Sequence, residues 1–232
     1  MNNSVLTIKI KQRLNKIDSQ DYDNIECWQV VESFNKAQVE WARRQLHGMN
    51  SVQEGDEQST RRIDDLQALL NTQPLTVSDE QVFYSANIPE NYLQWKRVDT
   101  FATNKCCDKR RMVVYLAEEA NINQLLRDEG KKPSFDWAET FATLKNNKVN
   151  IYTNGDFEVA SADLTYYRQP RKIQIQGCVD PYTGVESLVN VESEFKDDII
   201  EVIIDEAASI LAGDIESINQ FSRGSGTAER NN

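Results

Sequence analysis

The chain of 232 residues lacks the features that mark several common classes of protein. No apolar run approaches the length that a bilayer-spanning helix needs, so the sequence predicts no membrane segment. Residues 1–4 (Met-Asn-Asn-Ser) are not a basic region followed by an apolar stretch, so we expect no secretory signal. Four cysteines are too few for a disulfide scaffold at this length, and we expect reduced thiols in a protein made in the cytosol.

Histidine occurs once, which restricts the catalytic arrangements open to the chain. His47 would have to serve any Ser-His-Asp or Cys-His pair, yet it ends a helical pattern just before Gly48, where a cation suits the helix dipole. Adjacent Cys106 and Cys107 have no second pair at zinc-ligand spacing, and no glycine-rich phosphate loop follows a predicted strand. We therefore predict that the chain is not an enzyme and holds no metal or cofactor.

Basic residues are scarce relative to acidic ones. The 26 Lys and Arg residues face 37 Asp and Glu residues, and a net charge of −11 argues against binding to nucleic-acid phosphates. Nine acids and a single base, Lys196, lie between Glu192 and Glu216. The opposite sign gathers once, in residues 105–111. In a ring of identical subunits, this basic segment could contact the acidic last helix of a neighbour.

Helical periodicity occurs at both ends of the chain, and strand-like segments lie between. Apolar residues three and four apart predict helices over 4–17, 23–47, 59–70 and 197–220. Segments rich in β-branched and aromatic residues predict strands over 75–115, and Asn154-Gly155 predicts a hairpin in a small antiparallel meander over 149–167. Residues 134–144 fit either a short helix or an irregular aromatic loop.

These elements predict an α+β fold class. We expect a helical bundle of two or three N-terminal helices and a long C-terminal helix, with a small antiparallel β insertion domain. The expected boundaries are 1–74 and 190–221 for the bundle, 75–189 for the insertion and 222–232 for a flexible tail.

Carboxylates are the only abundant reactive groups. Glu192, Glu194 and Lys196 alternate on an extended segment, an arrangement also found in some magnesium nucleases. The simpler interpretation, which we favour, is that Glu194, Asp197 and Asp198 charge the first turn of the last helix, where anions are stabilised.

The strand ending near Pro170 carries aromatic residues that could reach a partner. Tyr166 and Tyr167 point to opposite sides of this strand, so one of them is expected to be exposed beside Arg168. An interface element and a plain sheet edge are equally compatible with the pattern.

Several segments, in this order, resemble the ring proteins of head–tail connectors in crAss-like and related tailed bacteriophages. They are Val113-Val114-Tyr115, Lys132-Pro133-Ser134, Val149-Asn150-Ile151-Tyr152 and Leu164-Thr165-Tyr166-Tyr167-Arg168-Gln169-Pro170, together with the endings 194–201 and 207–217. The similarity covers roughly residues 80–220. The chain departs from the pattern at Gln169, where a second basic residue is expected before the proline.

The resemblance implies a virion structural protein, a subunit of a dodecameric ring in the head–tail connector, made in the host cytoplasm. Its partners would be the portal protein and neighbouring tail ring or tail hub proteins, and the genome would pass through without specific binding. Interface candidates are Lys105, Lys109, Arg110, Arg111, Tyr166, Tyr167 and Arg168. Acids expected to line the lumen, where like charge repels DNA phosphates, are Glu194, Asp197, Asp198, Glu201 and Asp205.

Two other functions remain as alternatives. The first is a phage-encoded metal-dependent nuclease that uses Glu192, Glu194 and Lys196. The second is a binding or assembly module that never enters the particle.

Overall fold

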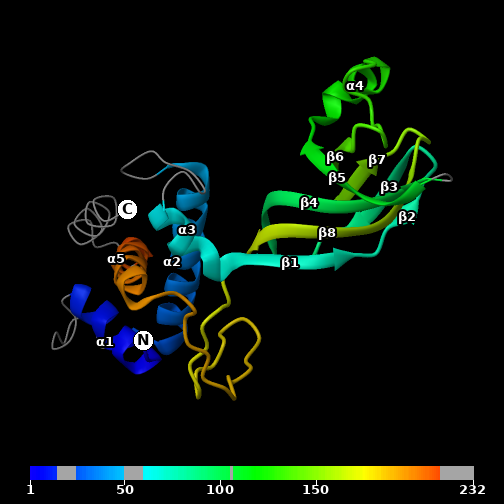
Figure 1. The fold of residues 1–232 in the computed structure, drawn as a ribbon. Helices are drawn as coiled ribbons and strands as arrows, with labels where there is room; N and C mark the ends of the chain where they lie inside the picture. Colours follow the sequence, from blue (N-terminus) through cyan, green and yellow to red (C-terminus); the bar gives the residue numbers. More distant parts are fainter. Residues whose placement is uncertain (15–24, 50–59, 105–106, 215–232) are drawn as a thin grey trace. The chain divides into compact units, whose positions relative to one another are not determined.

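The computed structural model describes residues 1–14, 25–49, 60–104 and 107–214 (Figure 1). The chain forms two compact units. The first unit comprises Met1–Leu69 with Pro170–Asn232, and the second comprises Leu70–Gln169. The boundaries between the units thus fall at 69/70 and 169/170, where the sequence suggested 74/75 and 189/190. Residues 215–220 of the expected last helix, and the expected tail at 222–232, lie outside the described part of the chain.

The first unit contains helices from both ends of the chain. Its α-helices are α1 (Asn3–Arg13), α2 (Cys27–His47), α3 (Thr60–Leu66) and α5 (Asp197–Asp214), and α3 continues into the 3₁₀ turn η2 (Gln67–Leu69). Helix α2 packs mainly against α5, and its apolar stripe buries Phe34 and Trp41. The Trp41 ring meets Phe195 edge-on, with the ring centroids 5.1 Å apart. The predicted end of α2 is confirmed, because Gly48 takes a left-handed conformation with φ 70°.

The second unit is a curled sheet of eight strands (Figure 1). The strands are β1 (Leu70–Leu75), β2 (Ser78–Asp79), β3 (Phe83–Asn87), β4 (Tyr92–Asn104), β5 (Cys107–Leu116), β6 (Glu139–Lys145), β7 (Lys148–Tyr152) and β8 (Glu158–Arg168). Their order in the sheet is β1-β8-β4-β5-β6-β7-β3-β2. A short helical segment, η3 (Glu119–Asn121) and α4 (Ile122–Arg127), links β5 to β6.

The predicted fold class is wrong. The β part is not a small antiparallel insertion in a helical bundle but an eight-stranded mixed sheet that makes up most of a unit of its own. The undecided segment at 134–144 supplies most of β6, and β6 pairs with β5 in parallel, through a crossover that includes η3 and α4. The end of the predicted helix 59–70 also differs, because Leu70 already begins β1.

The predicted meander is wrong as well. The turn at Asn154-Gly155 does reverse the chain, with both residues at positive φ. However, β7 pairs with β6 and β3, whereas β8 pairs with β1 and β4, so the two strands that the turn connects are not neighbours. Strand β8 runs unbroken from Glu158 to Arg168.

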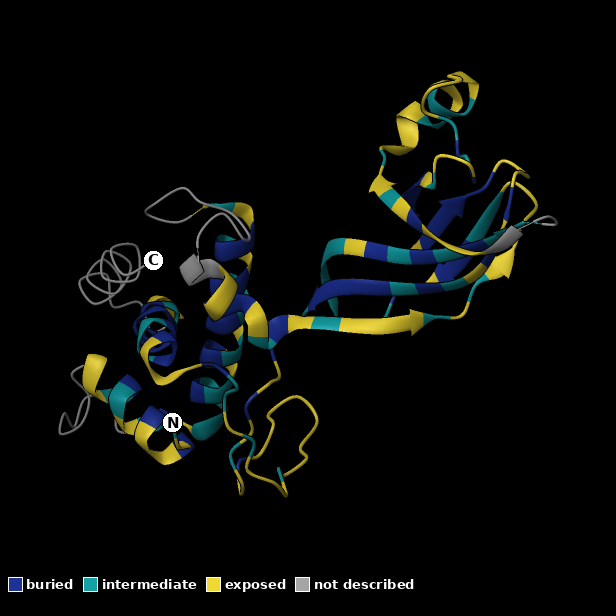
Figure 2. Ribbon diagram, in the orientation of Figure 1, coloured by how far each residue is buried: buried dark blue, intermediate teal, exposed yellow. Residues whose placement is uncertain are grey.

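The core of the sheet unit lies along its inner strands. Figure 2 shows buried positions running along β4 and β8, while the edge strand β1 is mostly exposed. Val98, Met112, Ile151 and Leu164 contribute to one buried cluster that also includes Tyr166. The short inner strands β6 and β7, each with four consecutive buried residues, and the long strand β8 therefore carry most of the burial in this unit.

Candidate functional site

Glu201 and Asp205 of α5, termed the acidic row below, face α1 of the same unit. Glu201 forms ion pairs with Lys9 and with Arg13, whose Nη2 lies 3.2 Å from Glu201 Oε2. The Nε of Arg13 donates to Asp205 Oδ1 at 2.6 Å, and the Asp205 side chain is almost fully buried. Both carboxylates are therefore paired with cations of α1 inside the unit, which leaves them little free charge with which to repel DNA as predicted lumen residues.

Sequence reasoning missed the cations that bind this row. Lys9 and Arg13 are four residues apart on α1, and Glu201 and Asp205 are four apart on α5, so each pair shares one helix face. The matching spacings of opposite charge were a usable signal. Reading the acids alone suggested an open acidic face.

Glu206 is a buried carboxyl between α2 and α5. It forms an ion pair with Arg44, whereas its Oε2 has no hydrogen-bond partner. Burial raises the pKa of Glu206 from 4.5 to about 7, and a shared hydrogen bond with Glu40 adds to this rise while Arg44 opposes it. A carboxyl with such a pKa could exchange a proton near neutral pH, but its surroundings are a helix–helix contact rather than a cleft.

The simpler interpretation of Glu194, Asp197 and Asp198 holds for two of these three acids. Asp197 and Asp198 are exposed in the first turn of α5, so that part of the prediction is confirmed. Glu194 precedes the helix and accepts the backbone N–H of Arg171 at 3.0 Å.

The nuclease arrangement does not assemble. Glu192 is exposed, Glu194 is engaged with the Arg171 backbone, and Lys196 forms an ion pair with Asp64. In residues 1–14, 25–49, 60–104 and 107–214, no three His, Cys, Asp or Glu side chains converge as metal ligands. His47 is exposed in the last turn of α2.

The basic segment spreads over both faces of β5. Lys105 lies outside the described residues. Arg110 donates to the carbonyls of Phe135 and Asp136, at 3.1 and 2.9 Å. On the opposite face, Arg111 binds the Asp99 carboxylate and Lys109 Nζ lies 4.8 Å from the centroid of the Phe101 ring.

The prediction of an exposed tyrosine at the end of β8 is wrong. Tyr166 and Tyr167 are both fully buried. The Tyr166 hydroxyl donates to Asn91 Oδ1 at 2.8 Å and accepts from Asn71 Nδ2 at 3.2 Å. Alternation predicts one exposed side chain only if one face of the strand meets water, and the burial of both tyrosines shows that both faces of β8 are covered at this point. Neither tyrosine can form an external interface, while the neighbouring Arg168 is half-buried.

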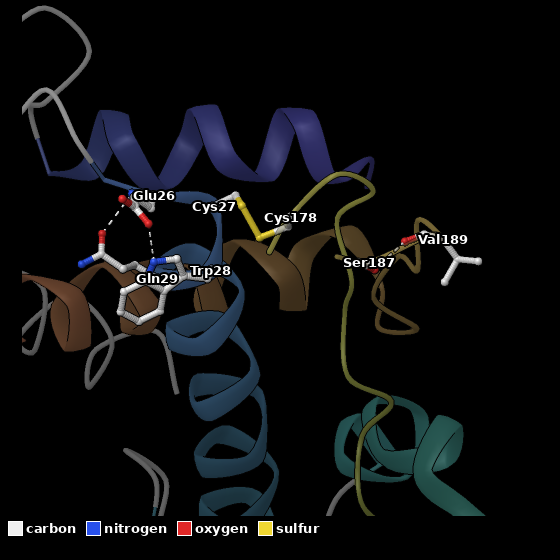
Figure 3. Close-up of a disulfide and its surroundings, with 7 residues drawn as sticks. All are labelled: Glu26, Cys27, Trp28, Gln29, Cys178, Ser187 and Val189. Atoms are coloured by element: carbon white, nitrogen blue, oxygen red, sulfur yellow. Dashed lines mark hydrogen bonds between the residues drawn. A yellow bond between two sulfur atoms is a disulfide. The ribbon is translucent and has the colours of Figure 1, made fainter. Parts of the chain in front are cut away.

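The cysteine prediction fails for two of the four residues. Cys27, the first residue of α2, forms a disulfide with Cys178, and their Cα atoms are 5.8 Å apart (Figure 3). The two cysteines are separated by 151 positions, so no local spacing pattern points to the pair. The bond ties the loop at 177–190 to the start of α2.

One open hollow of about 520 Å³ lies in the sheet unit, between the ends of β5 and β6 and the η3–α4 segment. Its walls include Tyr115, Glu118, Gln124 and Lys131. The buried Thr140 hydroxyl in this wall already donates to the Tyr152 carbonyl, so it is not available to a ligand.

Comparison with known proteins does not assign the chain to a family. No protein-family model matches the sequence, and no significant match was found among curated proteins. Among the described residues, no helix combines the length and the apolar character that a bilayer crossing requires.

Proposed function

We propose that the chain is a structural subunit of a ring in the head–tail connector of a tailed bacteriophage, between the portal and the tail. The resemblance of residues 80–220 to ring proteins of crAss-like and related phages supports this proposal. In it, copies of the chain form a closed ring that surrounds the DNA channel, with the portal protein and a tail ring or hub protein as neighbours.

The observation that carries the proposal is an ordered loop of exposed apolar residues at 177–190. Val179, Tyr182, Val185, Leu188 and Val189 are all exposed. Exposed apolar clusters of this kind mark surfaces that contact other proteins. Four carboxylates of segment 192–216, by contrast, are engaged in contacts within the first unit, which favours a structural over a catalytic role; they are Glu194, Glu201, Asp205 and Glu206.

Fewer acids than the sequence suggested could repel DNA from a channel wall. Of the five acids first assigned to the lumen, Asp197 and Asp198 are the two that are exposed, and Asp197 pairs with the Met1 amino group at 2.9 Å. A channel wall needs only weak repulsion to keep DNA from adhering, and exposed carboxylates screened by salt supply a force of that kind.

Mass spectrometry of purified phage particles tests the proposal. We expect the chain to be present in about the same copy number as the portal protein. A chain found in infected cells but missing from mature particles would instead be an assembly module that never enters the virion. Magnesium-dependent cleavage of plasmid DNA that is lost on Glu194→Ala would favour a nuclease.

A further inference from the structure

The loop at 177–190 has no apolar core beneath it. Cys178 is the one buried residue in this range, Ser187 is half-buried, and every other residue is exposed. Most of its backbone hydrogen bonds run within it. The Ser187 N–H donates to the Cys178 carbonyl at 2.8 Å, and the Asp180 N–H donates to the Val185 carbonyl at 3.0 Å. A hairpin without a core is marginally stable by itself, so another contact must hold it in place.

The Cys27–Cys178 disulfide supplies that contact (Figure 3). Among the residues that the structure describes, no hydrogen bond or ion pair joins the range 177–189 to a helix of the first unit. The position of this range against α2 therefore depends on one bond between two sulfur atoms.

The base of the loop is held without the disulfide. The side-chain amide of Asn3 on α1 donates to the carbonyls of Gln174 and Val191, at 2.8 and 3.0 Å. The side chain of Asn35 on α2 accepts the Ile173 N–H at 2.8 Å, and Ile173 is fully buried. Opening the disulfide would therefore leave the base in place and release only the segment between 177 and 189.

The bond lies where it can open and close again. Cys27 is half-buried rather than enclosed, so a small thiol or disulfide can reach it. Cys178 follows Gln174 by four positions, and Gln174 stays anchored to Asn3. The short tether keeps the Cys178 thiol close to Cys27 after the bond opens, which favours its re-formation.

We propose that the Cys27–Cys178 disulfide is a redox switch for the order of this loop. Oxidation fixes the loop against the start of α2, with Tyr182 79% exposed and Leu188 82% exposed in one arrangement. Reduction keeps the base and lets the segment beyond it move. Binding a partner through the fixed loop costs less conformational entropy than binding through the mobile loop. The switch is a property of the loop and does not depend on the proposed function.

The exchange partner is a low-molecular-weight thiol–disulfide couple such as glutathione. On oxidation, the Cys27 thiolate attacks one sulfur of glutathione disulfide, the sulfur–sulfur bond breaks, and one glutathione leaves as a thiolate. The Cys178 thiolate then attacks Cys27 Sγ in the mixed disulfide, and the second glutathione leaves. The two protons of the protein thiols pass to the two glutathione thiolates, and reduction is the reverse sequence. A reducing cytosol would thus give the mobile loop, and an oxidising medium would fix it.

Hydrogen exchange of single amides in the full chain tests the switch. The protein is equilibrated with reduced glutathione or with glutathione disulfide, and thiol alkylation followed by mass spectrometry reports the state of the bond. The Asp180, Gly184 and Ser187 amides should exchange at least about 10-fold faster in the reduced chain, because their hydrogen bonds lie within the released segment. The Ile173 and Val191 amides, bonded at the base, should keep their rates.

Two double variants show which thiols are responsible. Cys27→Ser with Cys178→Ser should give fast exchange in the loop and unchanged exchange at the base in both buffers. Cys106→Ser with Cys107→Ser removes the other two cysteines and should keep the full response to glutathione.

Three results would overturn the inference. The first is a loop whose amides exchange at the same rate in both buffers. The second is acceleration at the base and along α2 equal to that in the loop, because the bond would then support the whole unit. The third is a disulfide that stays intact in reduced glutathione. Each measurement uses the purified chain alone, so none of these results bears on whether phage particles contain it.

Discussion

Among single residues, Glu206 carries a carboxyl that is buried beside Arg44. Its pKa of about 7, against 4.5 in an ordinary setting, means that folding takes up a proton between these two values. The contribution of Glu206 to stability is therefore complete below pH 4.5 and is lost as the pH rises to about 7. Burial is the main cause, and Glu40 and Arg44 are the charged groups that act on it.

Glu206→Gln should remove this pH dependence. An amide does not ionise, so the unfolding free energy of the variant should lack a decrease on the order of 2–3 kcal/mol that the unaltered protein shows over this range. Urea unfolding at several pH values measures both proteins, and the difference between them cancels the other titrating groups. Parallel stability curves would show that Glu206 titrates normally.

The residue scale also shows where a correct local rule gave a wrong answer. Alternation correctly places Tyr166 and Tyr167 on opposite faces of a strand. It cannot show that both faces of β8 are covered at this point. The engaged state of Glu201 was equally invisible from its own segment, since its partners Lys9 and Arg13 lie about 190 residues away. Exposure is a property of the fold and not of the strand or helix alone.

Among the elements, α1 is held to α5 by charge as well as by apolar contact. Arg13 forms ion pairs with both Glu201 and Asp205. Removal of the Arg13 side chain would leave the buried Asp205 carboxylate without this partner. We expect Arg13→Ala to lower the unfolding free energy by about 1–2 kcal/mol, because an unpaired buried carboxylate is costly. The exposed neighbour Gln12→Ala is the matched control for denaturant unfolding. Equal stability of the two variants would show that α1 docks without this contact.

The Cys27–Cys178 disulfide also stabilises the first unit, because it joins the start of α2 to the loop at 177–190. Cys27→Ser with Cys178→Ser should lower the unfolding free energy by about 2–5 kcal/mol, since the bond closes a long loop of the unfolded chain. Thiol titration of the unfolded, unreduced protein is the direct check. Two reactive thiols are expected from the four cysteines, and four would show that the bond does not form.

Single helices and strands could be predicted more readily than the pairing of one strand with another. The apolar stripe of α2 and the end of this helix at Gly48 can be predicted from the spacing of residues within the segment. The strand character of β4 and β5 can be predicted in the same way. The parallel pairing of β5 with β6 does not, because no period in either segment records which strand lies beside it. Asn154-Gly155 likewise specifies a reversal without specifying that β7 and β8 are separate in the sheet.

In the whole molecule, two units carry different parts of the proposed assembly. The helical unit carries the exposed apolar loop at 177–190, and the sheet unit carries the open hollow beside η3 and α4. Head-to-tail contacts between two different surfaces of one chain can repeat, and closure of such contacts gives a ring. Ring formation of this kind can depend on a template that sets the number of copies. In the proposed function, the portal would serve as this template.

The mass of the complex formed on purified portal tests the central claim, that this chain assembles with copies of itself in a phage connector. Native mass spectrometry of the full-length protein mixed with portal should show one added subunit for each portal subunit, with no partially filled species in excess of chance. Portal that stays bare at saturating protein, under conditions where the chain is folded, would contradict the account.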